Sequence, residues 1–282
     1  MGVFKALIEI SKKPGNYDEK KSQLLKKLDS FLIDFKKKDL SLTKSEAKSK
    51  DFDELILLID FLTDLWNEII VKKLNEECPT YRAKVLEKML NRFLVQARET
   101  LFLLSHKLGL SAISNVRLFM EAFAITKHII ETSENEAKRF MDYGYYQQTL
   151  EEKSELDPRF IEEYGEKNKD NKFYSIPYGW CSTEEKMTGE KLIKKIGSRD
   201  LLDFYRLTCN YIHASPYSLV QISNSDNPFF PIPCKVLVNI VRNTLFHFII
   251  LTINYCFSDD EKHPYHVLLS MLVPDLVKFK VE

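Results

Sequence analysis

The sequence predicts an all-α fold, a bundle of about eight helices with irregular loop insertions and one continuous core. The 282 residues include only 8 Gly and 10 Pro, and so few helix breakers favour long helices over a many-stranded sheet. Apolar residues also recur at helical spacing along much of the chain. With 44% apolar and 29% charged residues, the composition is that of an ordinary globular protein.

Four long helices are predicted in the first half of the chain, because leucine, isoleucine and phenylalanine repeat there on one helical face. Pro79 ends one of them, and Thr80 is expected to cap the next. Gly109 interrupts the pattern, and Ser111 is expected to cap the helix that follows. The predicted helices are 17–38, 51–75, 81–107 and 112–140.

The second half alternates helices with irregular segments. Residues 151–190 are polar and rich in turn residues with scattered aromatics, which predicts a surface insertion with one short helix. Residues 218–233 form a second irregular loop, rich in Asn, Ser, Phe and Pro. The predicted helices here are 201–214, 234–257 and a short one within 263–278.

Positive charge is concentrated in the first 50 residues of the chain. The net charge is zero, but residues 1–50 carry 13 Lys against 7 Asp or Glu. We therefore expect a Lys-rich N-terminal helical region, 1–80, before a helical domain, 81–282. The lysines form either a solvated face or a weak electrostatic guide for an anion such as RNA. The balanced total differs from that of a dedicated nucleic-acid-binding protein.

Cysteine usage favours a reducing, cytoplasmic location. The chain has five cysteines and no Cys-x-x-Cys pair, so we expect buried thiols, no zinc site and no cofactor. Residues 236–257 are apolar enough to suggest a membrane helix, but Arg242 and His247 interrupt them. We expect a buried core helix and no membrane partner.

The main candidate site lies between Arg206 and His213. At about 100° per residue, Arg206, Asn210 and His213 fall within roughly 40° of one another on a helix. Arg suits phosphate oxygens, His transfers protons near neutral pH, and Asn orients either group. These groups are what metal-independent cleavage of RNA requires. The structural alternative is an Arg paired with an acid such as Asp203.

Two reserve sets have weaker geometry. Arg242 and His247 are about 140° apart on a helix, whereas Asn243 shares a face with His247. Because the surrounding helix is apolar, a buried internal network is the alternative for this set. Arg117 and Glu121, at i and i+4, form an ion pair that either cross-links helices or lines a polar cavity.

Several enzyme classes are disfavoured because their motifs are missing from the sequence. The chain has no G-x-x-x-x-G-K, G-x-G-x-x-G, H-E-x-x-H or G-x-S-x-G. The sequence therefore argues against a P-loop nucleotide hydrolase, a dinucleotide-dependent dehydrogenase, a zinc protease and an α/β hydrolase.

The Arg-x6-His spacing of Arg206 and His213, at the end of a helix in an all-α chain, resembles the signature of the HEPN superfamily. The segment 114–121 and residues 203–215 resemble a bacterial helical family that is often found near defence genes. The resemblance covers roughly residues 85–257. The family often has a polar residue directly after the Arg, where this chain has Leu207, whereas Arg242 is followed by Asn243.

The resemblance implies a metal-independent endoribonuclease that acts as a homodimer, with two copies of the motif facing one composite cleft. Arg206 would polarise the scissile phosphate, and His213 would act as acid or base. An RNA substrate, an anti-phage or toxin role and an antitoxin or defence-system partner are also implied. The alternatives are a non-catalytic adaptor of a defence system, and a small-nucleotide sensor that uses Arg117 and the 151–190 segment.

Overall fold

The computed structural model describes residues 8–10, 12–39, 50–67, 80–182, 186–196, 199–213, 215–216, 220 and 231–257. These residues form helices and no strand, which confirms the all-α prediction. The long helices are α2 (Tyr17–Asp39), α3 (Lys50–Leu65), α5 (Tyr81–Ser105), α6 (Gly109–Glu131), α7 (Glu134–Glu151), α11 (Arg199–Ile212) and α13 (Cys234–Phe257). The short helices are α8 (Pro158–Tyr164), α9 (Lys172–Ser175) and α10 (Gly189–Lys195). The predicted helix within 263–278 and most of the 218–233 loop lie outside the described residues.

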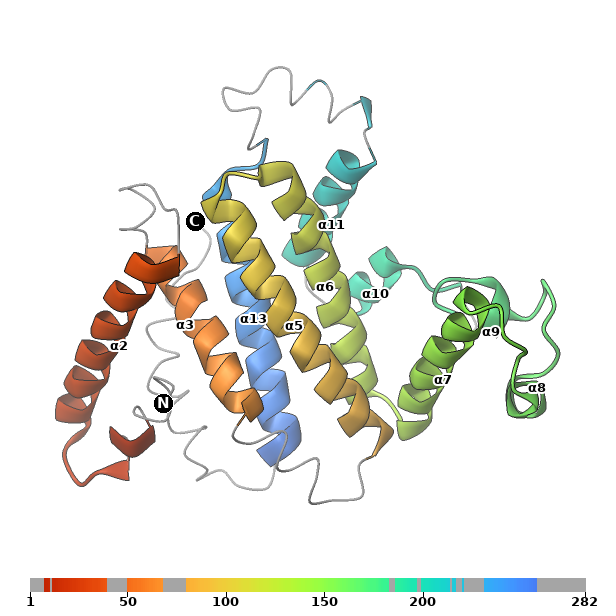
Figure 1. Ribbon diagram of the computed structural model, residues 1–282, viewed down its shortest axis with the longest axis horizontal. Coiled ribbons are helices and arrows are strands. Elements are labelled where there is room, and N and C mark those ends of the chain that lie inside the picture. The colour runs from red at the N-terminus through yellow and green to blue at the C-terminus, as the bar shows by residue number, and fades with distance from the viewer. Residues whose placement is uncertain are drawn as a thin grey trace.

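Helices α3, α5, α6 and α13 make the centre of the bundle (Figure 1). Phe93 of α5 stacks on Phe248 of α13 with ring centroids 3.8 Å apart, and it meets Phe119 of α6 edge-on at 4.6 Å. All three rings are fully buried. Close packing of aromatic side chains from three helices fixes how these helices cross.

Helix α13 has the bounds that the sequence predicts, 234–257, and it is a core helix as predicted. Its side chains Leu237, Val241, Leu245 and Ile253 are completely buried against the neighbouring helices. In the described part of the chain it is also the one helix long and apolar enough to cross a membrane. Burial of these side chains within the bundle is typical of the apolar face of a core helix.

The Lys-rich region contributes to the same core. Helix α2 packs on α3, and α3 packs on α5 and α13 (Figure 1). Leu24, Leu28 and Leu32 of α2 are buried, whereas Leu25 is 45% exposed. One hydrophobic cluster extends from α2 to α13. Described residues on both sides of position 80 therefore share one core.

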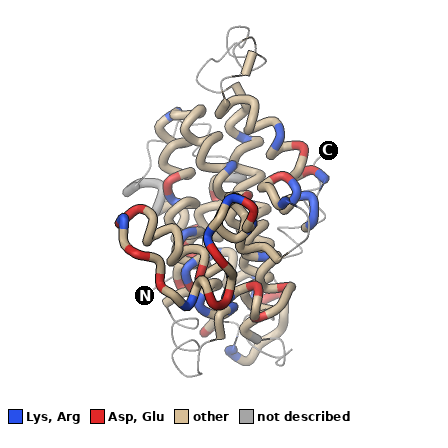
Figure 2. Tube along the Cα trace, turned by 90° about the vertical axis from the view of Figure 1, so that its right-hand side faces the viewer, with Lys and Arg blue, Asp and Glu red and all other residues tan. Residues whose placement is uncertain are grey.

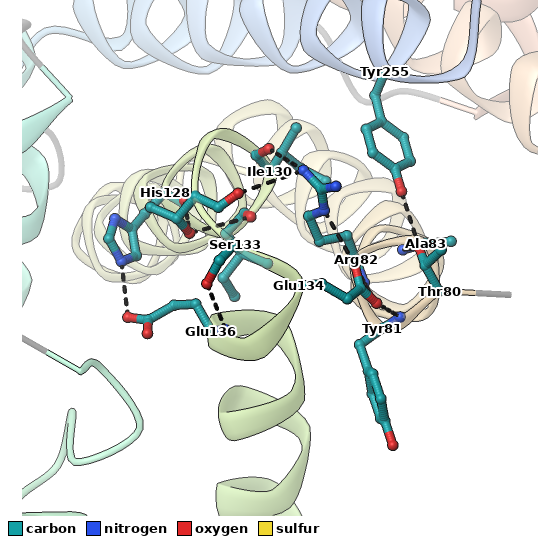
Figure 3. A network of polar contacts seen from close by, with 12 residues as sticks. Thr80, Tyr81, Arg82, Ala83, His128, Ile130, Ser133, Glu134, Glu136 and Tyr255 are labelled. Carbon is teal, nitrogen blue, oxygen red and sulfur yellow. Dashed lines mark hydrogen bonds and ion pairs between the residues drawn. The ribbon is translucent and has the colours of Figure 1, made fainter.

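The prediction of one helix over 112–140 is wrong. Helix α6 ends at Glu131 and α7 begins at Glu134, with Thr132 and Ser133 outside helical conformation. The Ser133 hydroxyl accepts a hydrogen bond from the Glu136 amide at 3.2 Å and caps α7 (Figure 3). Ser-x-x-Glu is a common sequence at helix starts, so the signal was present in the sequence.

The start of α6 also differs from expectation. The helix begins at Gly109, so Ser111 lies inside the first turn and does not cap it. The chain reverses between α5 and α6 with Lys107 in the left-handed region, at φ 62°. The cap at the start of α5 is as predicted, because the Thr80 hydroxyl accepts from the Ala83 amide at 3.2 Å.

One ion-pair network joins the ends of α5, α6 and α7 (Figure 3). Glu134 accepts hydrogen bonds from the Tyr81 amide and, at 3.2 Å, from Arg82 Nε. Arg82 Nη1 donates to the Ile130 carbonyl at 3.3 Å. An anion thus lies at the N-terminus of α5 and a cation at the C-terminus of α6, as helix dipoles favour.

The 151–190 segment has more helix than the single short one predicted, because it contains α8, α9 and the start of α10. Together with α7 it extends to one side of the bundle (Figure 1). Tyr164 and Phe173 stack at 3.9 Å in a small aromatic cluster of its own. This extension brings Tyr178 and Cys181 beside α6.

Candidate functional site

Helix α11 has one buried face and one exposed face. Leu202, Tyr205 and Thr208 are buried where α11 packs on α6 and α10. The three residues of the main candidate site are all exposed: Arg206 and Asn210 within α11, and His213 one residue beyond its end. The His213 amide still donates to the Cys209 carbonyl at 3.0 Å, so the helical path continues to His213. The structure thus brings these three side chains to one solvent-facing stripe.

Arg206 already has an acidic partner, and it is not the one expected first. Its Nε and Nη2 donate to one oxygen of Glu190 on α10, at 2.9 and 2.6 Å. Asp203 is farther away, 3.8 Å from Nη1. The two side chains of the closer pair are 52% and 47% exposed, so water screens their attraction. An anionic ligand can therefore compete with Glu190 for this guanidinium.

A second polar cluster lies on the buried side of α11. We name Arg117, Glu121, Tyr178 and Tyr205 the Arg117 cluster. The Tyr205 hydroxyl donates to Glu121 Oε1 at 2.5 Å, and Arg117 Nη2 donates to the Tyr205 hydroxyl at 3.2 Å. The predicted Arg117–Glu121 ion pair is present at 3.2 Å, and Tyr205 makes it a cross-link between α6 and α11.

Burial sets the protonation of the two tyrosines in the Arg117 cluster. Burial raises the pKa of Tyr178 to about 12, and the charge on Glu121 adds to the effect. Burial and the hydrogen bond to Glu121 raise the pKa of Tyr205 well above its usual value. Both phenols therefore stay protonated at neutral pH and act as hydrogen-bond donors.

The polar atoms of the Arg117 cluster lie very close to Gly189, the first residue of α10, and leave little room for a side chain there. A Cβ at Gly189 would lie 2.6 Å from the Tyr205 hydroxyl and 3.1 Å from the Tyr178 hydroxyl. Arg117 Nε is buried without a hydrogen-bond partner within the described residues. The cluster is tightly filled, so its first role is to hold α6, α10 and α11 together.

Charges of both signs surround the exposed stripe. The exposed basic residues of α10 and α11 are Lys191, Lys194, Lys195, Arg199 and Arg206. The acids Glu190, Asp200 and Asp203 are interspersed among them. Figure 2 likewise shows Lys and Arg mixed with Asp and Glu along the chain. The mixture supports local contacts to an anion better than long-range attraction.

The structure does not bring the reserve set on α13 together at a surface. Arg242 is buried and donates from Nη1 to Glu54 Oε2 of α3 at 2.7 Å. Asn243 accepts from Arg242 at 3.3 Å, and His247 is exposed. Arg242 and Asn243 thus form the internal network that the apolar surroundings suggested, whereas His247 is exposed to solvent.

The sequence did not predict a third polar cluster, which is buried at the corner between α6 and α7. We name His128, Glu136 and Cys181 the His128 cluster. His128 Nε2 lies 3.2 Å from Glu136 Oε1 and 3.6 Å from Cys181 Sγ (His128 and Glu136 in Figure 3). The Ser182 amide donates to both carboxylate oxygens of Glu136, at 3.1 and 3.3 Å. The three side chains come from α6, α7 and the turn before α10, so no local sequence motif predicts the cluster.

Hydrogen bonds outweigh burial in the His128 cluster. Burial acts to lower the pKa of His128, but the contacts with Cys181 and Glu136 overcome it and raise the pKa to about 9. Burial acts to raise the pKa of Glu136, but hydrogen bonds from His128 and Ser182 lower it to about 2. At neutral pH His128 is therefore protonated and Glu136 is ionised, so the two side chains form a buried ion pair.

Residues 83–230 match a family of unknown function, DUF5677, and this segment is more than half of the chain. The chain belongs to this family. The matched segment begins in α5 and includes α6, α10 and α11, with the exposed stripe, the Arg117 cluster and the His128 cluster. Helices α2, α3 and α13, with Arg242, lie outside it. A search of curated proteins finds no match, and neither does a search of solved structures.

Proposed function

We propose that this DUF5677 protein is a metal-independent endoribonuclease of the HEPN type that cuts RNA at the exposed stripe of α11. One observation carries the proposal: Arg206 and Asn210 of α11, and His213 directly after its end, are all exposed to solvent. A buried, internally satisfied set would favour a structural role, and that is the state of Arg242 instead. The resemblance to HEPN proteins supplies the reaction.

Each side chain has a role that its chemistry supports. Arg206 releases Glu190 and holds two oxygens of the scissile phosphate with its planar guanidinium. His213 exchanges the proton, and Asn210, between them on the stripe, orients the ribose or the imidazole. A base takes the 2′-hydroxyl proton, the 2′-oxygen attacks phosphorus, and an acid protonates the departing 5′-oxygen. The products are a 2′,3′-cyclic phosphate and a 5′-hydroxyl.

A homodimer completes this scheme. Arg206 and His213 are seven positions apart, or about 10 Å along the helix axis, so the two side chains must extend toward each other to share one phosphate. The reaction also needs an acid and a base, and one stripe offers one histidine. Two copies that face each other across the RNA supply both. The resemblance to HEPN proteins adds the proposal of a toxin or anti-phage role in the cytoplasm, with an antitoxin or defence partner.

The test is RNA cleavage by purified protein in the presence of EDTA. We expect a 5′-hydroxyl and a cyclic phosphate on the products, and loss of cleavage in His213→Ala. His247→Ala is the matched control, because His247 is also an exposed histidine but belongs to the reserve set on α13. Activity that survives His213→Ala and disappears in His247→Ala would move the site to α13. If the wild-type protein cleaves no RNA at any salt concentration or with any RNA tested, the nuclease proposal is refuted.

A non-catalytic adaptor is the second candidate, and one observation favours it. Several large apolar side chains of α5, α6 and the turn between them are exposed, which is a feature of protein-binding surfaces. They are Val95, Phe102, Leu108, Leu110 and Leu118. If the protein is an adaptor, replacing Phe102, which is 52% exposed, with Ser should abolish the protein's effect in cells, whereas His213→Ala should not. Under the nuclease proposal His213→Ala abolishes that effect.

A further inference from the structure

The His128 cluster holds three potential metal ligands at one buried point. One imidazole nitrogen, one carboxylate oxygen and one thiol sulfur all lie within 4.8 Å of one another. His128 and Glu136 expose only 3% and 5% of their side chains, and Cys181 is also buried. Buried groups of this kind are uncommon unless they neutralise one another or bind a metal ion.

The geometry does not fit a nucleophilic relay. In a Cys–His–acid relay the thiol and the carboxylate contact different nitrogens of the ring. Here Cys181 Sγ and Glu136 Oε1 both approach Nε2 of His128. His128 Nε2, Glu136 Oε1 and Cys181 Sγ form a triangle of neighbouring atoms, as ligands around a common metal ion do.

The distances match those around tetrahedral zinc. Zinc binds nitrogen and oxygen at about 2.1 Å and sulfur at about 2.3 Å, which separates N from O by about 3.4 Å and N from S by about 3.6 Å. The observed separations are 3.2 Å for His128 Nε2 to Glu136 Oε1 and 3.6 Å for His128 Nε2 to Cys181 Sγ. An ion fits between these atoms with small movements of the side chains.

The surroundings hold the ligands in place. The Ser182 amide donates to both Glu136 oxygens, and the ring centroids of Trp180 and His128 are 5.8 Å apart. Arg139 Nε donates to the Trp180 carbonyl at 2.9 Å, which fixes the turn that carries Cys181. Hydrogen bonds and an apolar shell of this kind orient ligands in metal sites.

We propose that His128, Glu136 and Cys181 bind one zinc ion, with water in the fourth position. An imidazole, a carboxylate and a thiolate together favour zinc over magnesium or calcium, which prefer oxygen alone. A single cysteine leaves no Cys-x-x-Cys pattern, which explains why cysteine spacing gave no sign of the site. The ion joins α6, α7 and the turn before α10, and Tyr178 of that turn reaches the Arg117 cluster. The proposal does not depend on the nuclease function.

The test is metal binding by the full-length, tag-free protein, measured with Zn²⁺ and with Co²⁺. We expect one zinc ion per chain by elemental analysis, and a higher melting temperature with zinc than after chelation. Co²⁺ should give a thiolate-to-cobalt charge-transfer band together with tetrahedral d–d bands. Cys181→Ser should abolish that band and weaken zinc binding at least about 100-fold.

The control is Cys256→Ser, which changes another buried cysteine outside the cluster and should bind zinc like the wild type. Glu136→Gln is the second ligand variant, in case Cys181→Ser does not fold. Wild-type protein that binds no stoichiometric zinc, or binds cobalt without the charge-transfer band, would overturn the site. Equal loss of zinc in Cys256→Ser and Cys181→Ser would also contradict it.

Discussion

Two arginines of this protein each pair with a glutamate at nearly the same distance, yet their surroundings are opposite. Arg242 lies 2.7 Å from Glu54, and the two side chains are only 4% and 6% exposed. Arg206 lies 2.6 Å from Glu190, and about half of each side chain is exposed. Each arginine is followed by a histidine within seven residues.

Burial, and not the contact itself, separates a structural pair from an exchangeable one. A buried pair that loses one partner leaves an uncompensated charge in a low-dielectric interior. An exposed pair that loses one partner exchanges it for water at small cost. The Arg242 pair therefore holds α13 to α3, whereas the Arg206 pair leaves its guanidinium available to a phosphate.

The largest effect is expected from Arg242→Ala, which leaves Glu54 buried without this cation. The free energy of unfolding should fall by about 3–5 kcal/mol. Arg206→Ala is the matched control and should cost less than about 1 kcal/mol. Urea denaturation of the two variants measures both values, and equal losses would show that burial does not distinguish the pairs.

Gly179→Ala tests the turn that carries Cys181. A Cβ at Gly179 would lie 2.3 Å from the Lys172 carbonyl oxygen and 2.5 Å from that of Phe173, which are backbone atoms that cannot move aside. We expect a loss of about 1–3 kcal/mol in thermal or urea unfolding. Gly144→Ala is the control, because nothing lies within 4 Å of its Cβ and alanine favours the helix. It should be neutral or stabilising; a Gly179→Ala protein as stable as wild type would contradict the close approach.

Asp60 of α3 gives a pH-dependent prediction. Burial, reinforced by Asp64, raises its pKa from 3.8 to about 6, and its Oδ2 is buried without a hydrogen-bond partner in the described residues. The folded state thus binds this proton more tightly than the unfolded state, so the contribution of Asp60 to stability falls as pH rises from about 4 to 6. Asp60→Asn should stabilise the protein by about 1 kcal/mol at pH 7.5 and by much less at pH 4. The same gain at both pH values would show that the Asp60 charge is not responsible.

The smallest effect on stability is expected from Glu190→Gln. Loss of an exposed ion pair should change the unfolding free energy by less than about 1 kcal/mol. The variant also frees Arg206 from its competitor, so RNA binding should tighten several-fold at low salt. Fluorescence anisotropy with a labelled RNA measures this, and Asp200→Asn, which removes a nearby exposed acid that makes no contact with Arg206, controls for net charge. Weaker binding by Glu190→Gln would mean that Glu190 supports the RNA site and does not compete with it.

Helix positions and core residues follow closely from the sequence, because their signal is local. The apolar residues Ile113, Val116, Met120 and Phe123 predict the buried face of α6, and all four are buried. The break at Ser133 was missed because apolar residues continue on both sides of it. Only the short Ser-x-x-Glu signal marks the start of α7.

Contacts between distant residues could not be predicted in this way. Glu190 is an ordinary surface acid in sequence, and only the packing of α10 on α11 brings it to Arg206. Cys181 lies 53 residues after His128, in the 151–190 segment, which the sequence predicts to be a surface insertion. Long-range proximity has no periodicity, so the partners of a site appear only when the fold is known.

The most direct test of the account is RNA cleavage by Arg206→Ala in EDTA, with its melting temperature measured on the same sample. We expect cleavage to fall by about 100- to 1000-fold, as for removal of one charge-stabilising donor, while the melting temperature stays close to that of the wild type. Wild-type cleavage in this variant would show that the exposed arginine of α11 does not act on the phosphate.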